Sequence, residues 1–156
     1  MAKPIPAGYC TVTPSFTFKD SKKAIEFYTK AFGAKVLDVF PNPSGPGIMH
    51  ATIQIGDSIV MMADEGPQCQ SAETLGHSPI TLYLYVPDAD AAFKQAVAAG
   101  GTVMMPVADM FWGDRAGQIK DPFGYSWMIA THTQDLTPEQ IRKGAEAFFA
   151  QMAKGK

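Results

Sequence analysis

The chain has 156 residues, of which 46% are hydrophobic and 18% charged, which predicts one domain with a sizeable core and excludes a disordered chain. The net charge of −2 and the lack of any apolar run of roughly 18 residues exclude a basic nucleic-acid surface and a membrane span, so we expect neither partner. Two isolated cysteines and a start without a secretory signal favour the cytoplasm.

The first 65 residues carry the signals of a strand–helix–three-strand unit. Phe16 and Phe18 alternate with hydroxyl residues, as in a half-buried strand. Asp20 is a suitable helix N-cap and Gly33 a suitable stop, with apolar residues at three- and four-residue spacing between them. Further strands are expected near 36–40, 48–55 and 58–63. We predict a βαβββ module over about residues 10–65.

The same order of signals returns 68 positions later. Asp88 takes the place of Asp20, and Gly124 takes that of Gly56. The strands of this second unit are expected to start at Thr81 and to continue near 103–106, 116–120 and 125–131. A duplicated unit predicts a linker over 66–78, a second βαβββ module over about 79–132, and a ligand site between the modules.

The last segment predicts a helix over about 137–153. Thr137 and Gln140 form a capping-box pattern, and Pro138 occupies the first helical position. One apolar stripe runs along the helix through Ile141, Ala145, Phe148, Phe149 and Met152. Such a stripe buries against the domain's own sheet or against a second subunit, and the sequence leaves both open.

Strand alternation divides the side chains between two sheet faces. Phe16, Phe18 and Trp127 are expected to face the helices. The opposite face combines hydroxyls, aromatics and methionines, a mixture typical of ligand cups. The expected liners of this cup, with the neighbouring Phe-Trp loop, are Ser15, Thr17, His50, Met62, Tyr83, Tyr85, Phe111, Trp112 and Met128.

Three stretches carry a resemblance to a known family. They are D-x-x-x-A-I-E-F-Y-x-x-x-F-G-A from Asp20, MHATIQIGDSIVMMADE over 49–65 and FWGDRAGQIKDPFGYSWMIATH over 111–132. With the paired modules, they resemble the vicinal oxygen chelate superfamily of glyoxalases, bleomycin-resistance proteins and dioxygenases, and its PhnB-like branch in particular. The resemblance implies a single α+β domain over 1–156, with a curved mixed sheet and a C-terminal helix.

The metal enzymes of this superfamily place one ligand on each of four strands. Carried onto this chain, those positions fall at Thr13, Val60, Thr81 and Met128, and none is an imidazole, carboxylate or thiolate. We therefore expect no metal and no cofactor. A rebuilt site could use only His50 and His132, helped by Asp64 or Glu65, since the remaining histidine, His77, lies in a polar loop.

The loop over 111–115 offers further candidate contacts. Asp114 and Arg115 are expected to form a local ion pair, or Arg115 meets an anionic ligand group. Trp112 is placed to stack on a flat ring.

Three functions follow from these patterns. The preferred one is a metal-free binding protein that sequesters an antibiotic or flat aromatic metabolite, as a homodimer like the drug-binding members of the superfamily. The second is a metal-dependent or metal-free enzyme of lyase, isomerase or dioxygenase type, with His50 or Tyr83 as acid–base candidates. The third is an interaction partner that binds through its tail helix.

Overall fold

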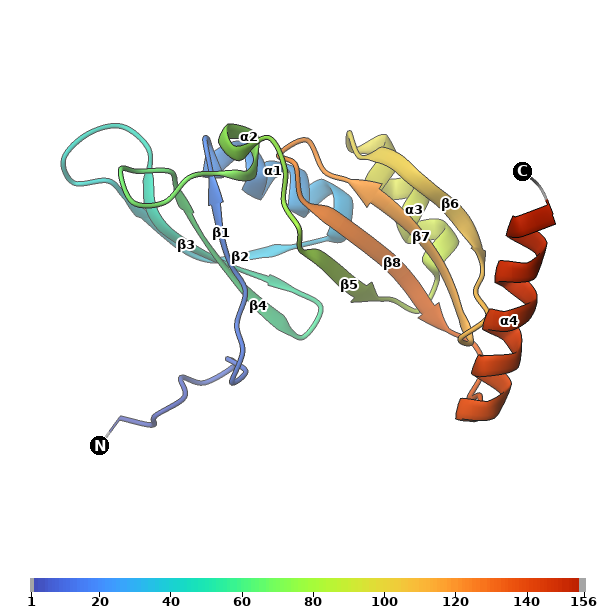
Figure 1. Ribbon diagram of the computed structural model, residues 1–156. Coiled ribbons are helices and arrows are strands. Elements are labelled where there is room, and N and C mark those ends of the chain that lie inside the picture. The colour runs from blue at the N-terminus through green and yellow to red at the C-terminus, as the bar shows by residue number, and fades with distance from the viewer. Residues whose placement is uncertain (1, 155–156) are drawn as a thin grey trace.

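The computed structural model describes residues 2–154 and contains two modules of equal topology (Figure 1). Module 1 holds β1 (Ser15–Phe18), α1 (Ser21–Phe32), β2 (Lys35–Pro41), β3 (Ile48–Ile55) and β4 (Ser58–Asp64). A short helix, α2 (Ala72–Leu75), lies in the linker and was not predicted. Module 2 holds β5 (Thr81–Tyr85), α3 (Ala89–Ala98), β6 (Thr102–Asp109), β7 (Asp114–Lys120) and β8 (Ser126–His132). The chain continues into α4 (Pro138–Lys154).

The strands form two four-stranded sheets, with the orders β1-β4-β3-β2 and β5-β8-β7-β6. In each sheet the first strand pairs in parallel with the last, and the other pairs are antiparallel. The predicted mixed, α+β architecture is thus confirmed, with the strands divided between two sheets. The outer strands β2 and β6 are edges, as are β1 and β5.

The predicted helix signals hold in detail. The carboxylate of Asp20 accepts a hydrogen bond from the Lys23 amide, and that of Asp88 accepts one from the Ala91 amide. Gly33 ends α1 with φ of 65°, a left-handed conformation that favours glycine. The helix starts were readable from the sequence because each cap is a local interaction.

One core joins the two modules, with α1 and α3 packed against each other. Phe16 stacks on Tyr125 across the modules, at a ring-centroid distance of 4.7 Å. The buried carboxylate of Asp121 accepts hydrogen bonds from the Tyr28 hydroxyl at 2.6 Å and from Trp127 Nε1 at 3.0 Å. Burial raises the pKa of Asp121. This carboxylate ties the helix of module 1 to the last hairpin of module 2.

Helix α4 stands at the outer end of module 2 (Figure 1). Its capping box is formed as predicted, with Thr137 and Gln140 each accepting the other's backbone amide. None of its described residues is buried. Over residues 2–154, no helix is long and apolar enough to cross a membrane.

Candidate functional site

The strand pairing in module 1 shows which face of the sheet each predicted liner occupies. We call the sheet face turned away from a module's helix its open face. Ser15 and Thr17 lie opposite Met61 and Ala63 on this face, while Phe16 and Phe18 are buried on the helix side. His50 shares the open face by alternation, and its Nε2 lies 3.1 Å from the Thr52 hydroxyl.

Met62 does not face the open side, so its prediction as a liner is wrong. It pairs with Phe16 and is 1% exposed in the core below α1. Val60 shares this orientation and is 4% exposed. The sequence comparison assumed that equivalent residues of the two modules lie 68 positions apart. In the structure the offset between β4 and β8 is 67 positions, so Met61, and not Val60, corresponds to Met128. A shift of one residue moves every side chain of a strand to the other face.

Module 2 carries aromatic side chains on its open face. Tyr83 lies opposite Met128, and Tyr85 lies opposite Ala130. The two tyrosine rings are tilted neighbours with centroids 5.9 Å apart, and the residues are 49% and 59% exposed. Three predicted liners, Tyr83, Tyr85 and Met128, therefore share one surface.

A buried carboxylate, Asp114, organises this surface. It starts β7, is 3% exposed, and its Oδ2 accepts hydrogen bonds from the Tyr85 hydroxyl at 3.1 Å and from Trp112 Nε1 at 3.0 Å. Its Oδ1 lies 2.8 Å from His132 Nδ1. Desolvation and the neighbouring Asp114 raise the pKa of Tyr85, so its hydroxyl stays a donor. One carboxylate thus fixes a tyrosine, a tryptophan and a histidine from three segments.

His132 lies between two carboxylates. Its Nδ1 contacts Asp114, and its Nε2 lies 3.0 Å from Asp135. Hydrogen bonds to Asp114 and then to Asp135 raise the pKa of His132 above its ordinary value. Both ring nitrogens are therefore occupied, which leaves this histidine as a support of the aromatic surface.

The predicted ion pair between Asp114 and Arg115 is wrong. These neighbours on β7 point to opposite faces, and Arg115 instead bonds Asp90 of α3 at 2.6 Å and Asp109 of β6 at 3.1 Å. Both acidic partners raise the pKa of the guanidinium. Arg115 ties α3 to the edge of the sheet. The predicted pair does not form because adjacent side chains on a strand point to opposite faces.

Phe111 packs against α4. Its ring lies 5.0 Å from that of Trp112 and 5.6 Å from that of Phe148. A Cβ at Gly144 would lie 3.0 Å from the Phe111 Cβ, tighter than most such contacts, so this glycine eases the close approach of helix and loop. The aromatic surface of module 2 thus continues through the loop onto the tail helix.

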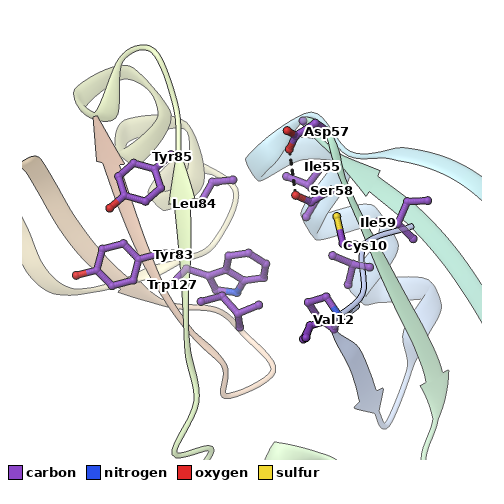
Figure 2. A pocket seen from close by; sticks show the side chains of 14 residues that line it. Cys10, Val12, Ile55, Asp57, Ser58, Ile59, Tyr83, Leu84, Tyr85 and Trp127 are labelled. Atoms are coloured by element: carbon purple, nitrogen blue, oxygen red, sulfur yellow. Dashed lines mark hydrogen bonds between the residues drawn. The ribbon is translucent and has the colours of Figure 1, made fainter. Parts of the chain in front are cut away.

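A cavity of about 370 Å³ lies between the modules (Figure 2). Its walls come from residues 10–14, the β3–β4 hairpin, β5 and Trp127 of β8. Leu84 and Trp127 point towards the hairpin, whereas the rings of Tyr83 and Tyr85 lie on the other side of β5. Among the predicted liners, these two tyrosines alone border the cavity, and they link it to the Asp114 network.

Comparison with known proteins agrees with this fold. The family model described as "Glyoxalase/Bleomycin resistance protein/Dioxygenase superfamily" matches residues 12–129. The chain belongs to the glyoxalase/bleomycin resistance/dioxygenase superfamily. It is 36% identical over 136 residues to the uncharacterized protein Mb0911c of Mycobacterium bovis, covering 84% of this chain and 89% of that protein.

Two solved structures of the superfamily fold illustrate the likeness. TioX from Micromonospora sp. ML1 matches with a TM-score of 0.64 and 27% identity, over 79% of this chain and 98% of that one. A PhnB protein from Bacillus cereus matches with a TM-score of 0.62 and 19% identity, over 78% and 99% of the chains, which supports the fold alone.

The four positions that hold the metal in superfamily enzymes do not fit a divalent ion here. Thr81 and Met128 lie on the open face of module 2. In module 1, the strand register places Met61, and not Val60, at the position equivalent to Met128. Thr13 precedes β1, and its hydroxyl bonds the Cys10 carbonyl. Hydroxyl and thioether groups are poor ligands for zinc, nickel, manganese or iron(II). Within residues 2–154, no three His, Cys, Asp or Glu side chains gather as metal ligands.

The acidic side chains considered for a rebuilt site have other roles. Asp64 accepts hydrogen bonds from the backbone amides of Ser21 and Ile48. Glu65 accepts hydrogen bonds from Ser71 and Thr74 at the start of α2, which lower its pKa to about 2. Both carboxylates hold backbone in place, and neither is directed at His50 or His132.

Proposed function

We propose that this superfamily member is a metal-free binding protein for a flat aromatic small molecule, such as an antibiotic or an aromatic metabolite. The observation that carries the proposal is the Asp114 network, which fixes Tyr85, the neighbour of Tyr83 on an exposed sheet face, together with Trp112 of the adjoining loop. Rigid aromatic rings beside a few placed polar groups are the usual means of binding flat ligands. Methionine at Met128 allows the surface to adapt.

The ligand is proposed to lie along β5, on the side of the strand that carries the Tyr83 and Tyr85 rings, next to Trp112. The chain is proposed to act as a cytoplasmic homodimer, because half-exposed Tyr83 and Tyr85 gain a second wall when another copy faces them.

In the alternative hypothesis that the protein is an enzyme, His50 and Tyr83 are the acid–base candidates. The superfamily description includes glyoxalases and dioxygenases, which supports that reading at family level only. The contacts favour binding, because His50 approaches the Thr52 hydroxyl, and none of the described residues places a carboxylate in hydrogen-bonding distance of its ring. A general base of high efficiency is normally oriented by a third group.

A thermal-shift screen against aromatic antibiotics and flat metabolites tests the proposal. A ligand at 100 times its Kd adds about 2.7 kcal/mol to the free energy of unfolding and raises the midpoint. Titration calorimetry of each hit should show affinity falling about tenfold or more in Trp112→Ala, and changing less than about twofold in Ser15→Ala. A broad screen without any shift, or turnover of a hit that disappears in His50→Ala, contradicts the binding proposal.

A further inference from the structure

The cavity between the modules lies apart from the aromatic surface. Strand β5 separates the two, because Leu84 points towards the cavity and the hairpin beyond it, while the rings of Tyr83 and Tyr85 lie on the other side of the strand (Figure 2). The cavity volume of about 370 Å³ falls in the usual range for small-molecule sites, roughly 300–1,000 Å³. The cavity is therefore large enough for a ligand of its own.

The walls of this cavity are apolar and belong largely to the core. Ile59, Val60 and Trp127 are only 7%, 4% and 3% exposed, and all three line the cavity. The Trp127 ring is held in place, because its Nε1 donates a hydrogen bond to the buried Asp121 carboxylate at 3.0 Å. Side chains that border an open space lack packing partners there, so an apolar group that fills the space gains contacts on every side.

A second cavity, of about 340 Å³, continues the first. Ile55 of the hairpin and Leu84 of β5 border both cavities. The other walls of the second cavity come from the end of α1, from Pro87 and from α3. Because the two cavities share walls, they form one elongated cleft along the free edge of β5, and its shape suits an extended alkyl chain better than a compact ring.

The cleft carries a single charge, at its hairpin end. Among the described residues that line the two cavities, Asp57 alone is ionisable at neutral pH, and none is Lys, Arg or His. Its carboxylate accepts a hydrogen bond from the Ser58 hydroxyl at 3.1 Å (Figure 2). None of the ion pairs within residues 2–154 involves this aspartate. A carboxylate without a cation beside an apolar cavity attracts a cationic ligand group and repels an anionic one.

We propose that this cleft is a second ligand site, which binds a linear aliphatic amine. The alkyl chain lies against Ile59, Leu84 and Trp127, and the ammonium group donates hydrogen bonds to the Asp57 carboxylate and the Ser58 hydroxyl oxygen. This site goes beyond the proposed aromatic site. The two lie on opposite sides of β5 and take ligands of different shape and charge.

Calorimetry with three probes of equal chain length tests the charge preference on the full-length protein. Octylamine, which like a lysine side chain is protonated near pH 7, should bind at about one per chain and about tenfold more tightly than octanoate, with octanol between them. Asp57→Asn, in an exposed turn, should weaken octylamine about fivefold and change octanol less than about twofold. Equal affinities for the three probes, or an octylamine affinity unchanged in Asp57→Asn, overturn the amine preference. Absence of saturable octylamine binding overturns the site itself.

Protection of a thiol locates the bound probe. Cys10 lines the cavity, whereas Cys69 is exposed beside β1 in another part of the molecule. The single-thiol proteins Cys69→Ser and Cys10→Ser are treated with iodoacetamide, with and without saturating octylamine. Octylamine should slow alkylation of Cys10 about fivefold or more and change that of Cys69 less than about twofold. An unchanged rate at Cys10 places the probe elsewhere and overturns the inference.

One further variant separates this site from the aromatic surface. Trp112→Ala, which should weaken a flat aromatic ligand, is expected to change the octylamine affinity less than about twofold. Octylamine binding that is lost in Trp112→Ala and kept in Asp57→Asn would assign the amine to the aromatic surface and overturn the second site. The thermal-shift screen with flat aromatic compounds decides the proposed function separately.

Discussion

The two modules share one topology but present different chemistry on their open faces. Module 1 offers hydroxyls and a histidine, with Ser15, Thr17 and His50 on the face turned away from α1. Module 2 offers two tyrosines and a methionine beside a buried carboxylate, Asp114. Duplication thus supplies two equivalent scaffolds, and a few side chains on the open strands give one of them the features of an aromatic binding surface.

The hairpins that close the modules differ in the same way. Module 1 turns at Gly56 and Asp57, and this aspartate is exposed and bonds the neighbouring Ser58 hydroxyl. Module 2 turns over residues 121–125, and Asp121 is buried and bonds Tyr28 and Trp127. An aspartate in a surface turn shapes the turn alone, whereas the same residue type in the core becomes a link between modules.

The largest expected effect separates these two aspartates. Asp121→Ala leaves the Tyr28 hydroxyl, the Trp127 indole N–H and two backbone amides without their buried acceptor. The free energy of unfolding, measured by urea denaturation, should fall by roughly 3–5 kcal/mol. Asp57→Ala should change it by less than about 0.5 kcal/mol. Equal effects at the two positions would refute the contrast between the hairpins.

Two adjacent methionines of β4, Met61 and Met62, allow a direct comparison of the open face with the helix side of the sheet. Met62 is 1% exposed below α1, so Met62→Ala should lower the free energy of unfolding by about 2–4 kcal/mol through lost burial and a cavity. Met61, half-buried on the open face, should cost less than about 1.5 kcal/mol in the same substitution, because its surroundings can relax. The reverse order would show that the register assigned to β4 is incorrect.

The buried polar groups of the two open faces should differ as well. Asp114→Ala removes the shared acceptor of Tyr85 and Trp112 and should cost about 2–3 kcal/mol of unfolding free energy. Thr52→Val in module 1 removes one hydroxyl contact to His50 and should cost about 1 kcal/mol. For any ligand found in the screen, calorimetry should show a clear loss of affinity in Asp114→Ala alone. A ligand that depends on Thr52 instead would transfer the site to module 1.

The smallest expected effect is a pH dependence specific to module 2. Contacts with Asp114 and Asp135 raise the pKa of His132 above its ordinary 6.5. The folded state therefore holds this proton more tightly, and the added stability is full below about pH 6.5 and is lost as pH rises through the folded-state pKa. Unfolding midpoints measured from pH 6 to 9 should fall with pH in the wild type, and this component should be absent in His132→Gln. His50→Gln is the matched control in module 1.

Local patterns in the sequence determined the modules, the helix caps and the tail helix. Asp20, Gly33 and Thr137 act on neighbours within a few residues, so their roles could be predicted without tertiary information. The faces of β1 and β5 followed from strict alternation. The superfamily motifs added the duplicated α+β fold, which the family match confirms.

Tertiary structure alone decided the partners of the site. The face of Met62 depends on a one-residue register difference between β4 and β8, which matching sequence letters cannot reveal. The partner of Asp114 is a tyrosine 29 positions away and not the adjacent Arg115, because neighbours on a strand point apart. The uncovered stripe of α4 likewise became visible only when the helix was placed beside Phe111 and away from both sheets. Sequence periodicity fixes which side of an element is apolar, but only the three-dimensional packing determines what covers it.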